Sequence, residues 1–207
     1  MRAPDWLTAR PVAHRGLHDI ARGIVENMPA AAQAAVDGNF AIECDIQLSS
    51  DGEAMVHHDD ALGRLTEGSG ALLGKTAAEL KTIQFKNTPE RMMTLGDLCA
   101  LVAGRVPLVI EVKSHFDGDR RLVKRMAEVL ASYSGPAVGM SFDPDQVVAL
   151  RELIPGHARG IVTRLPQQPV AKPFRDLVKM RVPAAHHQRQ RRVLHRMLQD
   201  HRVYVAF

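Results

Sequence analysis

Short apolar runs alternate with amphipathic segments along the first three quarters of the chain. Apolar and polar residues alternate from Phe40 to Leu48, which is typical of a β-strand with two different faces. Residues 106–112 form a nearly continuous apolar run, as expected for a strand buried on both faces. The strands that these patterns predict lie at residues 11–14, 40–48, 53–57, 106–112, 137–142 and 160–163.

The segments between these strands carry helix signals. Residues 28–36 are rich in alanine, and apolar residues between 122 and 130 fall on one helical face. Thr76 and Thr94 are each followed three residues later by an acidic residue, which is typical of a capping box. Asp143 precedes a proline and predicts an N-cap. This order of strands and helices predicts a parallel sheet covered by helices.

The pattern changes after about residue 157. Residues 193–198 favour a helix and residues 203–207 a strand, but clean periodicity is lost. Residues 1–156 hold 16 Lys and Arg against 21 Asp and Glu, a formal charge of −5, whereas residues 157–207 carry +9. Residues 1–156 therefore lack the excess of basic residues that is typical of nucleic-acid binding, and the pI of 9.3 arises from the last quarter of the chain.

This basic segment has three open interpretations. It could be a solvated helix face, an arm that binds phosphate or nucleic acid, or a terminus that is not a native barrel end. Glycine, acidic residues and periodicity are lost together there, as in an altered reading frame or a non-homologous terminus. We favour this third interpretation.

Length and composition narrow the class of protein further. With 207 residues, 45% apolar and 24% charged, the chain is expected to form one globular domain. No apolar run reaches the roughly 18 residues of a membrane helix, and the first residues lack the apolar core of a secretory signal. Two cysteines, Cys44 and Cys99, provide no disulfide framework, so we expect a cytoplasmic protein.

Residues that can carry chemistry lie at the ends of the predicted strands or, for Glu43 and Asp45, within the strand at 40–48. These residues are His14, Arg15, Glu43, Asp45, His58, Glu111 and Lys113. In a parallel barrel the carboxyl ends of the strands share one mouth, which is where active sites lie. We therefore expect these side chains to meet at one site.

Three carboxylates in one mouth would repel each other unless a cation held them. Positions i and i+2 of a strand face the same side, so Glu43 points with Asp45, and Glu111 with Lys113. Ligation by carboxylates alone suits a hard cation such as Mg²⁺ or Ca²⁺ better than zinc. The alternative is a buried ion-pair network with Arg15 and Lys113.

The basic residues complete a site for phosphate. Arg15 offers a bidentate fork and Lys113 a point charge beside the expected cation. His14 and His58 can both titrate near neutral pH, so one can deprotonate a nucleophile while the other protonates a leaving alkoxide. The set predicts cleavage of a phosphate ester. His57 faces away from His58 and is interpreted as structural.

The motifs around these residues resemble those of the glycerophosphodiester phosphodiesterase family. The matching stretches follow the family's order and spacing from about residue 11 to residue 156. They are Ala13-His14-Arg15-Gly16, Glu26-Asn27, Ile42-Glu43-Cys44-Asp45, Ser50-Asp51-Gly52, the run from His58 to Thr66, Thr94-Leu95-x-Asp97 and Ile110-Glu111-Val112-Lys113-Ser114.

The resemblance implies an α/β fold of the TIM (β/α)₈-barrel type, in a single domain over residues 1–207. It implies hydrolysis of glycerophosphodiesters to glycerol 3-phosphate and an alcohol such as choline or ethanolamine, a small-molecule substrate that requires no nucleic acid. The roles that it implies are an acid–base pair of His14 and His58, phosphate ligands Arg15 and Lys113, and Glu43, Asp45 and Glu111 as ligands of one divalent cation, Mg²⁺ or Ca²⁺. Which histidine is the acid stays open.

The sequence departs from the family pattern in two respects, of which the second changes the expected fold. Met28 stands where the family often has threonine, and the family's later landmarks, a Trp-Thr-Val-type strand and a final Thr-Asp, are absent. A full barrel takes about 250 residues, so we expect an incomplete or atypical barrel at the C-terminal end. The alternatives are a lysophospholipase D-like enzyme for acylated substrates, an inactive truncated or frame-altered remnant, and a module that binds through the basic segment.

Overall fold

The computed structural model describes residues 4–164 and 203–206, whose strands form one sheet. Along the sheet the order is β1-β2-β4-β5-β6-β7, and β3 pairs with β2 beside this path. The strands are β1 (Val12–Ala13), β2 (Ala41–Leu48), β3 (Ala54–Val56), β4 (Leu108–Val112), β5 (Ala137–Ser141), β6 (Ala158–Arg164) and β7 (Val203–Ala206). The four pairings between β1 and β6 along this path are all parallel, as the alternation of strands and helices predicts.

Three of the described helices begin at a side-chain cap. The helices are α1 (Asp5–Thr8), η1 (Ile20–Arg22), α2 (Pro29–Asp37), η2 (Leu72–Gly74), α3 (Ala77–Leu80), α4 (Leu95–Val102), α5 (Arg121–Ala131) and α6 (Pro144–Leu153), and the three with such caps are α3, α4 and α6. Thr76 and Thr94 form the two capping boxes that the sequence predicts, and the Asp143 carboxylate accepts a hydrogen bond from the N–H of Asp145. These caps satisfy backbone N–H groups that have no partner within the helix.

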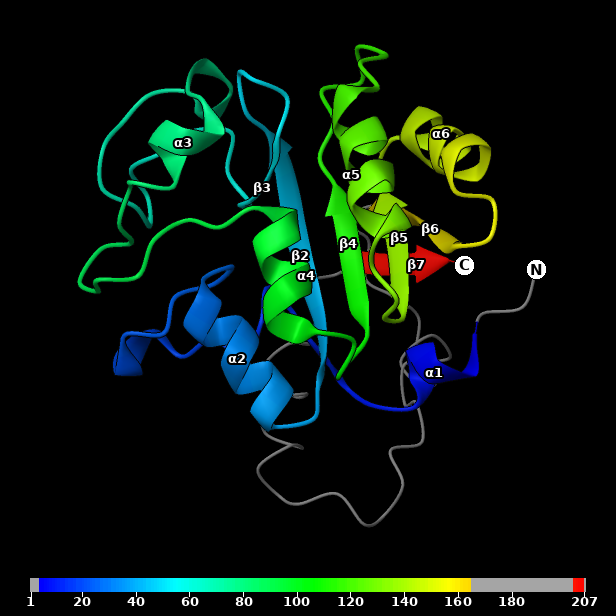
Figure 1. Ribbon diagram of the computed structural model, residues 1–207, viewed down its shortest axis with the longest axis horizontal. Helices are drawn as coiled ribbons and strands as arrows, with labels where there is room; N and C mark the ends of the chain where they lie inside the picture. Colours follow the sequence, from blue (N-terminus) through cyan, green and yellow to red (C-terminus); the bar gives the residue numbers. More distant parts are fainter. Residues whose placement is uncertain (1–3, 165–202, 207) are drawn as a thin grey trace.

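The two faces of the sheet pack against different partners. Ile42 and Ile110 face the main core, which the helices complete, and α2, α4 and α5 lie in front of the sheet in Figure 1. Val109 and Val138 face the opposite side, where Leu7 of α1 packs against them. This second face is the interior side of a barrel wall, and α1 contacts it near the amino ends of β4 and β5.

The described strands form a half-barrel. Five parallel strands are present in residues 4–164, where a complete barrel has eight. The segment 203–206 forms the predicted C-terminal strand, but it runs antiparallel to β6, so the barrel is atypical at this edge. The predicted helix at residues 193–198 lies outside the described residues. Within the described part of the chain, every helix is too short or too polar to cross a membrane.

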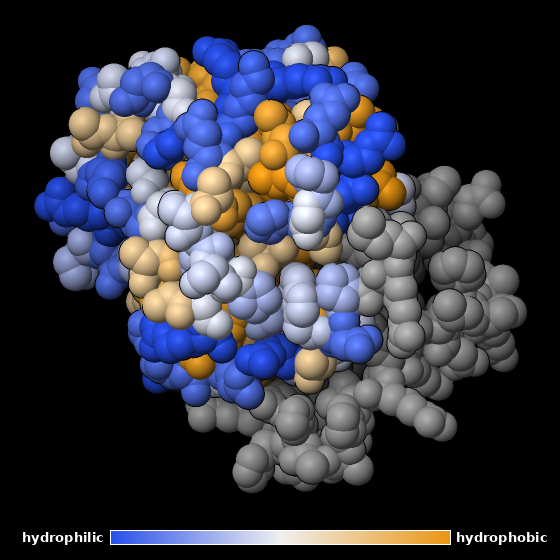
Figure 2. All heavy atoms as spheres, turned by 45° about the vertical axis from the view of Figure 1, so that its right-hand side comes forward, coloured by the Kyte–Doolittle hydropathy of each residue, from blue (hydrophilic) through white to orange (hydrophobic). Residues whose placement is uncertain are grey.

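Residues 49–94 interrupt the strand–helix alternation. They leave the carboxyl end of β2, return as β3 and continue through η2 and α3, at the upper left of Figure 1. This insertion has its own core, in which Met55, Leu80 and Phe85 are fully buried and pack with Met28 at the start of α2. On the face drawn in Figure 2 the surface is mainly hydrophilic, with apolar side chains in smaller groups between.

Candidate active site

Three buried carboxylates converge on neighbouring strands. Glu43 and Asp45 point to the same side of β2, and Asp45 lies opposite Glu111 of β4 in the parallel register. One carboxylate oxygen of each residue lies within 4.8 Å of the others. The side chains are nearly inaccessible, with exposed fractions of 8% for Glu43, 1% for Asp45 and 10% for Glu111. The structure thus brings together the three residues that the sequence analysis expects to hold a metal.

Two cations neutralise part of this charge. The Lys113 Nζ atom lies 2.7 Å from Asp45 Oδ1 and 2.6 Å from Glu111 Oε1, and Arg15 Nε lies 3.3 Å from Asp45 Oδ2. Burial alone would raise the pKa of Asp45, but Lys113 and Arg15 hold this pKa below its ordinary value. Asp45 and Glu111 thereby raise the pKa of Lys113 in spite of its burial. The ion pairs of the alternative interpretation are therefore present around Asp45.

The carboxyl group of Glu43 carries the least compensated charge of the cluster. Its Oε2 accepts a hydrogen bond of 3.0 Å from the backbone N–H of Arg15, and His14 Nε2 lies 3.8 Å away. Burial, followed by repulsion from Asp45 and Glu111, raises the pKa of Glu43 well above its ordinary value. A divalent cation among the three oxygens would supply the missing positive charge, and an all-carboxylate donor set fits Mg²⁺ or Ca²⁺.

A tight turn after β1 delivers His14 and Arg15 to this cluster. Arg15 adopts a left-handed conformation with a φ of 57°, and Gly16 follows with a φ of 80°. The N–H of Gly16 lies 3.2 Å from the carbonyl oxygens of both Ala13 and Glu43. The turn therefore ties the first motif to β2, and Gly16 supplies a conformation that other residues reach only with strain.

Gly16→Ala is expected to lower the free energy of unfolding by more than about 2 kcal/mol. A Cβ at this position would lie 2.9 Å from the Ala31 carbonyl carbon and would also be strained by the positive φ. Gly52→Ala is the matched control, because Gly52 has a φ of 86° with no atom within 4 Å of the added Cβ. It should cost only about 1 kcal/mol. Equal shifts of the urea unfolding midpoint would show that the contact with Ala31 contributes nothing.

Glu26 and Asn27 support the site from the loop that follows the turn. The Asn27 side chain donates a hydrogen bond of 2.9 Å to Asp45 Oδ2, and its Oδ1 accepts one from the N–H of Asp45. Glu26 Oε1 accepts a hydrogen bond of 2.7 Å from Arg15. In the sequence this pair stands out only as part of the family motif, whereas in the structure both side chains contact candidate site residues.

His58 follows β3, which pairs with β2 in a different way from the one that the sequence predicts. The alternation of strands and helices predicts parallel strands, but β3 is antiparallel to β2 and returns alongside it. The hairpin pairs Val56 with Ile46, and the N–H of His57 then donates to the carbonyl oxygen of Asp45. The His57 side chain is buried, with an exposed fraction of 2%, whereas the His58 side chain is 32% exposed.

Asp59 contacts His58 directly, and Arg64 is linked to His58 through Asp59. His58 Nδ1 lies 2.7 Å from Asp59 Oδ1, and Arg64 donates hydrogen bonds to both oxygens of Asp59. Arg64 Nη2 also donates to Glu26 Oε1 at 2.7 Å. Arg64 lies in the motif run from His58 to Thr66, but the sequence does not indicate a role for it. Its partners become apparent only when the insertion is folded.

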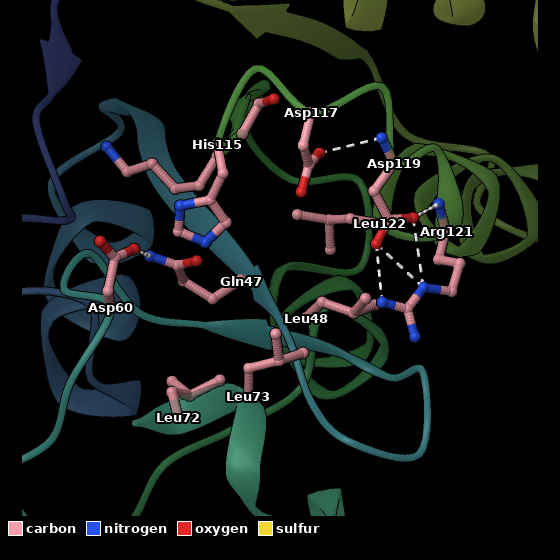
Figure 3. Close-up of a pocket in the computed structure, with 12 residues that line it drawn as sticks. Gln47, Leu48, Asp60, Leu72, Leu73, His115, Asp117, Asp119, Arg121 and Leu122 are labelled. Carbon is pink, nitrogen blue, oxygen red and sulfur yellow. Dashed lines mark hydrogen bonds and ion pairs between the residues drawn. The ribbon is translucent and has the colours of Figure 1, made fainter. Parts of the chain in front are cut away.

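A cleft opens beside Lys113, between η2 and the start of α5 (Figure 3). Figure 3 shows His115 and Gln47 at its centre, Leu72 and Leu73 below them, and Asp117 above. The cleft also has Leu48 and Leu122 in its wall, so its lining combines leucine side chains with carboxylate, amide and imidazole groups. Gln47 is held toward one wall, because its amide donates to Asp60 Oδ1 at 3.0 Å.

Comparisons with known proteins match this chain to phosphodiesterases. A family model described as the glycerophosphoryl diester phosphodiesterase family matches residues 14–199. The match continues past residue 156, into the basic segment, and so extends further than the motifs that carry the resemblance. This extension weakens the interpretation of the segment as a non-homologous terminus or an altered reading frame.

Individual relatives agree with the family match. The Bacillus subtilis protein YhdW, provisionally named as a glycerophosphodiester phosphodiesterase, is 32% identical over 162 residues, which are 74% of this chain and 65% of YhdW. Human glycerophosphodiester phosphodiesterase 1 is 26% identical over 76% of this chain and 49% of its own length. A phosphodiesterase from Oleispira antarctica, solved with its product sn-glycerol-3-phosphate, is 27% identical with a TM-score of 0.67, over 76% of this chain and 68% of that chain. The chain thus spans about half to two thirds of the length of these curated relatives.

Proposed function

The chain belongs to the glycerophosphoryl diester phosphodiesterase family, and on this basis we propose that it hydrolyses glycerophosphodiesters to glycerol 3-phosphate and an alcohol. The observation that carries the proposal is the convergence of His14, Arg15 and Lys113 on the three buried carboxylates. Acid–base, phosphate-binding and metal-binding groups each contribute to the cleavage of a phosphodiester.

The proposal assigns one divalent cation, Mg²⁺ or Ca²⁺, to Glu43, Asp45 and Glu111. When bound, this cation would polarise the phosphate and stabilise negative charge on its oxygens. Glu43 supports the assignment best, because its carboxyl group is buried beside two other carboxylates while the two neighbouring cations are directed at Asp45. Ionising all three groups together needs a further positive charge.

The remaining residues bind the phosphate and move protons. We assign Arg15 and Lys113 to the non-bridging phosphate oxygens, because both cations already lie at the edge of the carboxylate cluster. His14 and His58 form the acid–base pair, with side chains about one third exposed and therefore accessible to substrate. One removes the proton of the nucleophile, and the other protonates the leaving alkoxide.

The cleft beside Lys113 suits one arm of the diester. Lys113 contributes to the cleft wall and also contacts Asp45 and Glu111, so a phosphate bound by Lys113 lies next to this space. Carboxylates and amides in the lining can bind hydroxyl or ammonium groups of a small alcohol. The four leucines are the observation that favours the second candidate, cleavage of a lysophospholipid with an acyl chain.

A comparison of two substrates tests the proposal. The full chain, assayed with Mg²⁺ or Ca²⁺, should release choline and glycerol 3-phosphate from glycerophosphocholine with a higher kcat/KM than it releases choline from lysophosphatidylcholine. Preference for the lysophospholipid would replace the first candidate by the second. Absence of release from both substrates by folded protein would contradict the enzyme assignment and favour an inactive member of the family.

A further inference from the structure

We propose that Arg64 is a positioning residue that sets the place of His58 relative to the phosphate-binding end of the site, an inference that rests on the proposed function. Arg64 lies in the insertion, whereas the carboxylate cluster lies on the sheet. A continuous series of polar contacts joins the two parts. It runs from His58 through Asp59, Arg64, Glu26 and Arg15 to Asp45.

The first contact fixes the tautomer of His58. Hydrogen bonds from Arg64 and His58 oppose the effect of burial and lower the pKa of Asp59 to about 2. Asp59 is therefore an acceptor at neutral pH, and His58 Nδ1, 2.7 Å from Asp59 Oδ1, must be the donating nitrogen. His58 Nε2 is then the atom left to exchange a proton with the substrate.

Arg64 connects this histidine to the loop that follows β1. Its guanidinium donates to both oxygens of Asp59 and, through Nη2, to Glu26 Oε1. The same Glu26 oxygen accepts a hydrogen bond of 2.7 Å from Arg15 Nη1, so one carboxylate bridges two guanidinium groups. Although burial opposes it, these hydrogen bonds lower the pKa of Glu26 and keep its bridging oxygen ionised.

The geometry requires arginine rather than a generic positive charge. A planar guanidinium can satisfy two oxygens of one carboxylate and one oxygen of a second carboxylate at once, whereas a lysine ammonium is a point charge on a flexible stem. The Arg64 side chain is 48% exposed, and ion pairs at such exposure contribute little to folding. Its role is therefore expected to appear in catalysis and in the state of His58 rather than in stability.

Arg125 provides a matched control. Its guanidinium donates at 2.9 Å to both oxygens of Glu53 and also at 2.9 Å to Glu128. Like Arg64, it therefore donates two hydrogen bonds to one carboxylate and a third to another carboxylate. The Arg125 side chain is 36% exposed. Arg125 and its two partners, Glu53 and Glu128, lie outside the contacts that join His58 to Asp45.

Steady-state kinetics of the full chain with glycerophosphocholine and Mg²⁺ test the role of Arg64. Arg64→Lys should lower kcat by about 10- to 100-fold with little change in KM and in the unfolding temperature, whereas Arg125→Lys should leave all three unchanged. Because Asp59 and Arg64 act as one unit on His58, combining Asp59→Asn with Arg64→Lys should lower kcat no further than Asp59→Asn alone. Equal losses in the Arg64 and Arg125 variants, or multiplied losses in the double variant, would overturn the proposal.

A second readout separates this proposal from the function itself. In protein with ¹⁵N-labelled imidazoles, the Nδ1–H resonance of His58, assigned by its absence in His58→Gln, should disappear or shift in Arg64→Ala and persist in Arg125→Ala. An unchanged resonance in Arg64→Ala would refute the positioning role. If the wild-type chain releases no glycerol 3-phosphate, the proposed function fails, while this resonance still decides whether Arg64 positions His58.

Discussion

His14→Ala is expected to lower kcat for glycerophosphocholine by about 10²- to 10⁴-fold, the usual contribution of a general acid or base. The imidazole lies 3.8 Å from Glu43 and is about one third exposed, so it borders both the carboxylate cluster and solvent. Its removal takes away one proton-transfer group and leaves the ion pairs of Lys113 in place. Steady-state kinetics on purified wild-type and variant chains measure the loss.

His157→Ala is the control for this prediction. His157 directly precedes β6, at the amino end of a parallel strand and therefore at the opposite end of the sheet from the cluster. Its variant should retain wild-type kcat. The assignment of His14 is contradicted if His14→Ala keeps more than about a tenth of the wild-type kcat. Loss of a general acid or base should lower kcat by at least about 10²-fold.

Glu43→Gln is expected to abolish metal-dependent turnover and at the same time to stabilise the metal-free protein. The amide keeps the shape of the side chain and its acceptor oxygen for the N–H of Arg15 but removes the charge beside Asp45 and Glu111. Calorimetric titration with Mg²⁺ or Ca²⁺ should detect binding to the wild type only. Turnover should fall by at least about 10²-fold, as expected when the group that stabilises charge on the phosphate is lost.

The sign of the stability effect follows from the raised pKa of Glu43. The folded, metal-free chain holds this proton at pH values where the unfolded chain, with an ordinary pKa near 4.5, has already released it. The contribution of Glu43 to stability is therefore fully present below the unfolded-state pKa and is lost as the pH rises from there toward the folded-state pKa. The loss is at most about 1.4 kcal/mol per pH unit, and Glu43→Gln should not show it.

Urea unfolding of both proteins in EDTA, between pH 4.5 and pH 8, checks this sign. The difference in unfolding free energy should grow with pH in favour of Glu43→Gln, and it should shrink when metal is added because only the wild type binds it. A variant that is less stable than the wild type in EDTA at every pH would contradict the description of Glu43 as an uncompensated buried charge.

Local signals in the sequence predicted much of the fold. The alternation from Phe40 to Leu48 corresponds to β2, and the apolar run at 106–112 contains β4 (Leu108–Val112). Thr76 and Thr94 cap the helices that follow them, because a capping box needs only four consecutive residues. The pairing of β2 with β4 then places Asp45 opposite Glu111, so the carboxylate cluster follows from pattern and register.

The contacts of the insertion could not be predicted from the sequence. β3 has the composition of an ordinary strand, and its antiparallel pairing with β2 depends on a turn that reverses the chain. The contacts of Arg64 with Asp59 and Glu26 span 5 and 38 residues, and the longer one exists only after the insertion packs beside α2. Periodicity and motif spacing contain no information on such long-range side-chain pairs.

Release of glycerol 3-phosphate from glycerophosphocholine, followed with and without EDTA, tests the central claim most directly. The full chain should release glycerol 3-phosphate in Mg²⁺ or Ca²⁺, lose this activity in excess EDTA and regain it when the cation is restored. The three carboxylates at Glu43, Asp45 and Glu111 and the histidine at position 14 would then form a working phosphodiesterase site. Folded protein that releases none, or release that continues unchanged in EDTA, would contradict a metal-dependent phosphodiesterase.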